Sequence, residues 1–303
     1  MRTRSNGPPT GNVPPPAGYA GRTVTKAPNW HELVVLDVLL NNLSTGLFLV
    51  AAVGELAAPA VFAAVTAWAY PVALVLLFAD LGCLVLDLGD PFRFHHMLRV
   101  FKPSSPMSLG TWCLTVFSLF LTVVVAVVAA VALGWLPGDS AVAWWARTLA
   151  VVGGLPFALG SAAYKGVLFS TSAQPGWKDA RWLGAYLMNS ALMLGAAELL
   201  LIAVLTDRAP AAATLRPTLG LLVILNAAPL VLLAADLSPL LARLHDRREL
   251  WAAGLLVLLT GVVVPMGMLL AGGPVALLAA VLSVLLASLG IRLAIVRLPH
   301  AAT

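Results

Sequence analysis

Residues 109–133 read LGTWCLTVFSLFLTVVVAVVAAVAL, a run of 25 residues without one charged side chain. The hydrocarbon core of a bilayer is about 30 Å thick, and a helix needs about 20 mainly apolar residues to cross it. This stretch is long enough to do so, and it therefore predicts a transmembrane helix.

The same pattern recurs along the chain, of whose 303 residues 60% are hydrophobic and only 10% charged. Soluble domains carry about 25% charged residues, and the mean hydropathy here is +0.95. The sequence predicts an all-α integral membrane protein with eight transmembrane helices in two four-helix bundles. Besides 109–133, the expected spans are 31–54, 61–86, 143–170, 182–205, 217–237, 250–271 and 274–297.

Residues 1–30 differ from the rest, since they are rich in proline and glycine and hold four basic side chains but no acidic one. Such a segment cannot bury enough apolar surface to order itself. It also lacks the apolar core and cleavage site of a secretory signal peptide. We expect a disordered basic cytoplasmic tail at 1–30, followed by a membrane domain at 31–303.

The basic residues predict the orientation, because retained cytoplasmic loops are enriched in lysine and arginine. Fourteen of the 18 basic residues fall on the side of the N-terminus, Lys165 falls inside a span, and only Arg147, Arg208 and Arg216 fall on the other side. Both termini are therefore expected in the cytoplasm, with the protein in a bacterial inner membrane. This bias also explains the basic pI without a nucleic-acid partner.

Polar side chains inside the spans gather toward the cytoplasmic side. A charge at the bilayer centre costs at least about 2.5 to 3.5 kcal/mol, so ionisable residues there indicate function. Polar residues near helix ends also snorkel or pair for purely structural reasons, which is the alternative for each one. The residues expected in a polar pocket near the cytoplasm are Asp37, Asp80, Asp87, Tyr164, Lys165, Asn189 and Asp236, while Glu55 and Glu198 lie further out.

Resident redox metals are not expected in this chain. Its five histidines stand at span ends or in loops, so no two face each other from the middle of the membrane as in a dihaem cytochrome. Cys83 and Cys113 alone cannot supply the four thiolates of an iron-sulfur cluster, and they are expected to pack as small apolar residues.

The loop between the second and third spans is the most distinctive segment. It reads DLGDPFRFHHM over residues 87–97 and SPMSLGTW over residues 105–112. This resembles the NrfD/PsrC family, the membrane subunits of polysulfide reductase-type oxidoreductases, whose pattern is D-L-G-x-P-x-R-F-x-H-M followed by S-P-M-S-x-G-x-W. Every fixed position of that pattern is met.

The resemblance covers roughly residues 19–200. Residues 164–170, YKGVLFS, are similar to the family's Y-x-G-x-L-L-S segment, and Trp177 follows them. Residues 19–30 resemble the segment before the first helix in actinobacterial members that are often encoded with formate dehydrogenase-like subunits. Three residues depart from the usual family sequence: Asn41 and Asn42 stand where many relatives have two glycines, and Asp90 stands at a variable position where an arginine is usual.

The resemblance implies a quinone-binding subunit, with menaquinone as the expected quinone and no bound haem or iron-sulfur cluster. Its implied partners are a four-cluster ferredoxin-like iron-sulfur subunit and, through it, a molybdopterin-type catalytic subunit. Residues 31–205 would form the quinone-site half and 206–303 the second half. The implied quinone contacts are Asp37, Asn41, Tyr164, Asp80, His96 and Arg93, and the implied proton path comprises Asp87, Lys165, Glu198 and Glu55.

Orientation adds one expectation of its own, because the predicted pocket opens toward the cytoplasm. The iron-sulfur partner is therefore expected on the cytoplasmic side, where the basic tail could dock it. A transporter or a purely structural membrane anchor is the competing function. No pair of broken helices in matching halves favours a transporter, and an anchor has no need for Asp37, Asp80, Tyr164 and Lys165 in one layer.

Overall fold

The described chain is entirely helical. The computed structural model describes residues 32–302, and this part contains no strand. Its helices are α1 (Glu32–Ala57), α2 (Pro59–Leu86), η1 (Pro91–Leu98), α3 (Pro106–Ala132), α4 (Ala141–Ser170), α5 (Leu183–Leu205), α6 (Ala209–Leu244), α7 (Arg247–Leu258), η2 (Leu259–Val263), α8 (Val264–Ala271) and α9 (Pro274–Ala302). The expectations for residues 1–30 lie outside the described residues.

Eight helices in the described part are long and apolar enough to cross a membrane, which confirms the predicted number of spans. The seventh span, Arg247–Ala271, is continuous through α7, η2 and α8, where η2 is a single π-helical turn. Helix α6 is longer than the sixth span predicted at 217–237, because a helix can continue beyond the apolar centre that hydropathy detects. Its outer turns include Arg216 at one end and Arg243 at the other.

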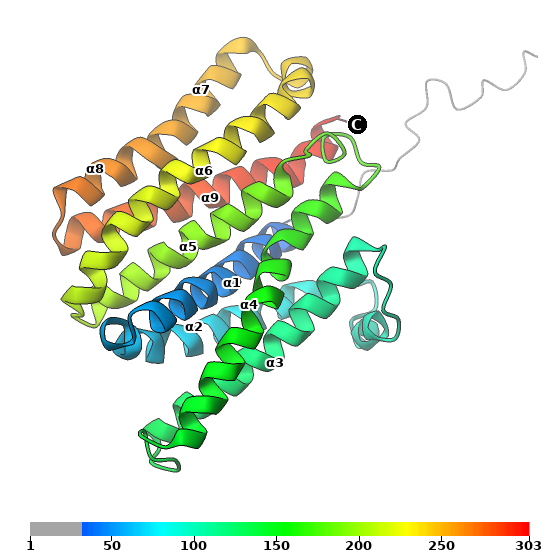
Figure 1. Cartoon of the computed structure of the whole chain (residues 1–303). Helices are drawn as coiled ribbons and strands as arrows, with labels where there is room; N and C mark the ends of the chain where they lie inside the picture. Colours follow the sequence, from blue (N-terminus) through cyan, green and yellow to red (C-terminus); the bar gives the residue numbers. More distant parts are fainter. Residues whose placement is uncertain (1–31, 303) are drawn as a thin grey trace, which may run out of the picture.

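Helices α1 and α5 form the centre of the fold (Figure 1). Most residues in the apolar windows of these two helices are buried, whereas the buried share is 28% or less in every other described span. Helix α1 contacts α2, α4, α5 and α9. The first and last spans thus meet, and the division into two four-helix bundles stays a prediction.

Two glycines bring the backbones of the central pair into contact. Gly46 of α1 lies against the carbonyl of Ala191 in α5, and Gly195 of α5 lies against the carbonyl of Gly46. A side chain at either glycine would overlap the backbone of the other helix. Small residues of this kind allow close helix packing in membranes, where van der Waals contact drives association.

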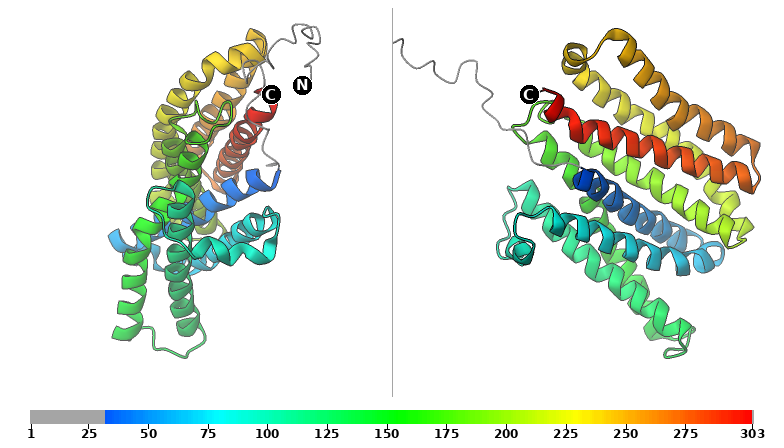
Figure 2. Two further views of the ribbon diagram at one scale, coloured as in Figure 1. Left: turned by 90° about the vertical axis from the view of Figure 1, so that its right-hand side faces the viewer. Right: turned by 180° about the vertical axis from the view of Figure 1, so that it is seen from behind.

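The two ends of the described chain lie on the same side of the membrane domain. Figures 1 and 2 show α9 ending beside the start of α1, and Arg297 of α9 forms an ion pair with Glu32 of α1 at 3.0 Å. We call this the near side, and the opposite one the far side. The loops after α2, α4 and α6 therefore face the near side.

Candidate functional site

Five polar side chains from three helices meet inside the near-side half of the membrane domain. We name this group, Asp37 and Asn41 of α1, Asp80 of α2, and Ser161 and Lys165 of α4, the Lys165 cluster. The Lys165 ammonium lies 2.7 Å from a carboxylate oxygen of Asp37 and 2.9 Å from one of Asp80. The Asn41 amide donates to Asp80 and to Ser161, both at 3.1 Å.

Helical periodicity explains how so few elements supply the cluster. Asp37 and Asn41 are four residues apart on α1, and Ser161 and Lys165 are four apart on α4, so each pair shares one helix face. Asp80 is fully buried on α2. Asp37 and Asn41 of the first span thereby contact Asp80 of the second span and Lys165 of the fourth.

Most hydrogen-bond donors of the cluster are in use. Lys165 donates to the main-chain oxygen of Asp37 and to the Asp80 carboxylate, both at 2.9 Å, and forms an ion pair with the Asp37 carboxylate. Both N–H groups of Asn41 are also used. The cluster holds two carboxylates and one ammonium group. Buried charge of this kind persists only where partners compensate it.

Tyr164 lies beside the cluster and connects it to the SPMSLGTW segment. Its ring is buried, and its centroid is 5.7 Å from the Lys165 ammonium. The ring occupies the space that a Cβ at Gly110 of α3 would need. The glycine of the motif is therefore required by the packing of this tyrosine.

The serines of the same segment fix the start of α3. The Ser105 side chain caps the helix by accepting from the Ser108 backbone N–H at 3.4 Å, and Pro106 occupies the first turn. The Ser108 hydroxyl in turn accepts from the Lys102 N–H at 3.0 Å and donates to the Val100 carbonyl at 3.2 Å. These bonds hold the loop against the near-side end of α3.

Arg93 and His96, predicted quinone contacts, lie elsewhere. Both are exposed on η1, where Arg93 forms an ion pair with Asp90 at 2.9 Å and the His96 ring contacts His95. Within residues 32–302, no hydrogen bond or ion pair joins either of them to the Lys165 cluster. Asp87 is the residue directly after α2, where its backbone N–H donates to the Cys83 carbonyl. The predicted roles of all three stay predictions.

The two outer acids lie in the far-side half and are not brought together. Glu55 pairs with Arg147 and accepts a hydrogen bond from the Tyr70 hydroxyl at 2.7 Å. A carboxylate oxygen of Glu198 in α5 is buried and has no hydrogen-bond partner in the described part of the chain. A proton path through these residues stays a prediction.

Arg292 was counted among the fourteen basic residues on the side of the N-terminus, but it is a polar residue of the membrane interior. It is fully buried on α9. Its guanidinium donates to Asn42 of α1 at 2.6 Å, to Ser190 of α5 at 3.2 Å, and to Ser288 of α9. Its position inside the expected span 274–297 was the signal that could have revealed it. The bias of basic residues toward the near side does not depend on it.

A comparison with known proteins gives a family match. A family model described as "Polysulphide reductase, NrfD" matches residues 24–296. The match includes the second half of the chain, to which the resemblance of residues 19–200 did not extend. A search of the curated proteins found no match.

Proposed function

We propose, because this chain belongs to the polysulphide reductase NrfD family, that it is the quinone-reactive membrane subunit of an oxidoreductase complex. The family consists in general of quinone-interacting membrane subunits that pair with an iron-sulfur subunit and a molybdopterin catalytic subunit. We propose that menaquinone is the quinone here, and that the iron-sulfur partner docks on the near side, in the cytoplasm.

The Lys165 cluster is the observation that carries this proposal. Reducing a quinone to a quinol requires two electrons and two protons, and in this scheme the partner supplies the electrons. The protons must pass through a membrane domain that is mostly apolar. A buried cluster with one carboxylate more than its ammonium groups, close to the near-side surface, suits the transfer of a proton.

The contacts within the cluster suggest which residues would touch the quinone. Asn41 has no N–H group left for a quinone oxygen, and Lys165 is held by two hydrogen bonds and its ion pair with Asp37. We therefore propose that both act behind the quinone contact rather than in it. The Tyr164 hydroxyl is the donor we propose for a quinone carbonyl, with Asp37 and Asp80 returning the proton to it. The quinone ring would then lie on the α3 and α4 side of the cluster.

Replacing Tyr164 by phenylalanine should raise the KM for a menaquinone analogue about tenfold in the intact complex. The change removes one hydrogen bond, worth about 1 to 1.5 kcal/mol, and keeps the ring that packs on Gly110. The KM is measured from steady-state rates of quinone reduction or quinol oxidation. Thr122→Val is the matched control, since this exposed threonine bonds only to its own helix at Ser118. An unchanged KM for Tyr164→Phe would remove this residue from the quinone contact.

The proposed orientation has a separate test. A reporter active only in the cytoplasm, fused after residue 303, should be active, because α9 ends on the near side beside the start of α1. The same reporter inserted between Gly272 and Gly273, in the far-side turn that joins α8 and α9, should be inactive. The reverse pattern would place the near side, and the partner with it, outside the cytoplasm.

A further inference from the structure

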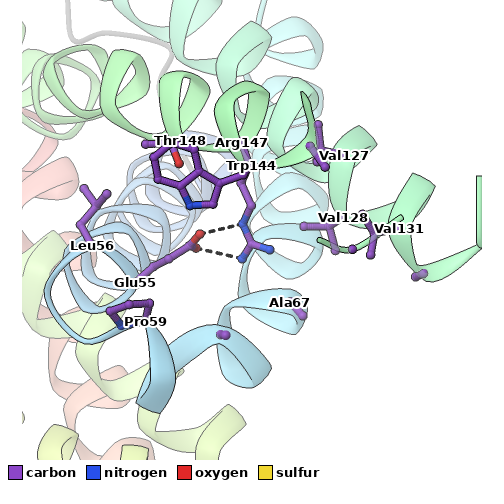
Figure 3. Close-up of a pocket in the computed structure, with 14 residues that line it drawn as sticks. Glu55, Leu56, Pro59, Ala67, Val127, Val128, Val131, Trp144, Arg147 and Thr148 are labelled. Carbon is purple, nitrogen blue, oxygen red and sulfur yellow. Dashed lines mark hydrogen bonds and ion pairs between the residues drawn. The ribbon is translucent and has the colours of Figure 1, made fainter. Parts of the chain in front are cut away.

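A pocket lies at the far side of the membrane domain, at the opposite end of α1 and α4 from the Lys165 cluster. It has a volume of about 480 Å³ and is formed by the α1–α2 turn, α2, α3 and the first turns of α4. Figure 3 shows the side chains around it. Those that matter here are Glu55, Ala67, Val128, Val131, Trp144 and Arg147.

The polar end of this pocket is a neutral ion pair in which some N–H donors are unused. Arg147 contacts both carboxylate oxygens of Glu55, at 2.7 and 2.9 Å, and donates to Thr66 at 3.0 Å. These contacts use Nε and Nη2. The guanidinium also lies over the Tyr70 ring, 5.6 Å from its centroid. Its third nitrogen has no hydrogen-bond partner among residues 32–302, and it points away from Glu55 toward the valines of α3 (Figure 3).

The remainder of the pocket is mostly apolar. Valines of α3 and alanines of α2 form its walls, and the Trp144 indole lies beside the ion pair. In Figures 1 and 2 the α3–α4 hairpin separates from the α1–α2 hairpin toward the far side. The pocket therefore lies between these two hairpins.

The charge balance of the site selects the kind of headgroup. An anion bound to Arg147 would leave a net negative charge in a low-dielectric site, because Glu55 already neutralises the guanidinium, and buried uncompensated charge is costly. A neutral oxygen acceptor carries no such cost and can use the unoccupied N–H groups. A flat neutral ring can also stack on the Trp144 indole.

We propose that this pocket is a second quinone-binding site, separate from the one near Tyr164. A quinone carbonyl would accept from Arg147, the ring would lie against Trp144, and the isoprenoid chain would leave between α2 and α3. The proposal rests on the proposed function for the choice of quinone, and it concerns binding alone. It places quinone at both sides of one membrane domain.

Photoaffinity labelling of the intact complex in lipid nanodiscs tests this proposal. An azido-naphthoquinone should label two segments, one around Tyr164 and one around Trp144, as mapped by mass spectrometry. Val128→Phe should fill the pocket and lower labelling of the Trp144 segment at least tenfold, with labelling around Tyr164 unchanged. Ala67→Phe fills the pocket from the opposite wall and should do the same.

The controls separate this inference from the proposed function. Val123→Phe adds the same ring on an exposed face of α3 and should leave both labels intact. Persistent labelling of the Trp144 segment in Val128→Phe and Ala67→Phe would overturn the second site. So would displacement of that label by phosphatidylethanolamine or phosphatidylglycerol but not by excess quinone, which would identify a lipid site. If the unaltered complex were labelled around Trp144 but not around Tyr164, the proposed function would be contradicted and the second site would stand.

Discussion

Replacing Lys165 by methionine should lower the free energy of unfolding of the membrane domain by about 3 to 5 kcal/mol. Methionine has nearly the same length and fits a helix, so the main loss is the ammonium group. Two buried carboxylates, those of Asp37 and Asp80, would lose their shared partner. Removing one member of a buried ion pair costs this much because the remaining charge is left without compensation.

Equilibrium unfolding in mixed detergent micelles measures this loss. Lys178→Met is the control, since Lys178 is an exposed residue of the α4–α5 loop and its replacement should change stability by less than about 0.5 kcal/mol. Adding Asp80→Asn to Lys165→Met should recover part of the stability, because one of the two uncompensated carboxylates is removed. Equal stability of Lys165→Met and Lys178→Met would contradict the ion-pair geometry.

The spans were predictable because the signal for them is local. Each needs only a continuous apolar run, which the sequence displays without reference to any other part of the chain. The ends of α6 were not predictable in the same way, since a helix continues through Arg216 and Arg243 while a hydropathy window does not. Here helix formation and membrane crossing are separate properties.

The candidate site was predictable in part. The shared face of Asp37 and Asn41, and the depth of Asp80 and Lys165, follow from helix geometry and topology. Which residues pair does not follow, because it depends on how α1 packs against α2 and α4. Arg292 and Asn42 are 250 positions apart in the chain, and no local sequence pattern predicts a contact over such a separation.

The loop motif illustrates what a resemblance can and cannot supply. Its Gly110 makes room for Tyr164, and its Ser105 caps α3, so these two positions have a structural reason. Arg93 and His96 of the same motif are exposed on η1 at the near side. That is the face on which we propose the iron-sulfur partner docks, so their environment in a complex would differ from the one described here.

The two asparagines of α1 link both polar groups of the interior. Asn41 belongs to the Lys165 cluster, and the adjacent Asn42 accepts from Arg292 and donates to the Ala162 carbonyl at 3.1 Å. The formal charges of the two carboxylates of the cluster are balanced by those of Lys165 and Arg292. The two amides thus connect a layer of polar residues from α2 to α9 whose formal charges sum to zero.

Replacing Gly46 by valine should destabilise the membrane domain by at least about 3 kcal/mol. The new side chain would have to occupy the space of the Ala191 carbonyl, and a helix backbone cannot turn aside as a flexible side chain can. Overpacking a well-packed core costs about 1 to 3 kcal/mol, and more where the obstacle is rigid. Separation of α1 from α5 would also disturb both Lys165 and Arg292, because α1 supplies partners to each.

Gly82→Val is the matched control, because a Cβ at Gly82 of α2 meets no atom within 4 Å. It makes the same chemical change in a neighbouring span, and its effect on the free energy of unfolding should stay below about 1 kcal/mol. Gly195→Val should resemble Gly46→Val, since Gly195 faces the Gly46 carbonyl across the same contact. If all three variants unfolded at the same detergent fraction as the unaltered protein, the close crossing of α1 and α5 would be wrong, and the central position of α1 with it.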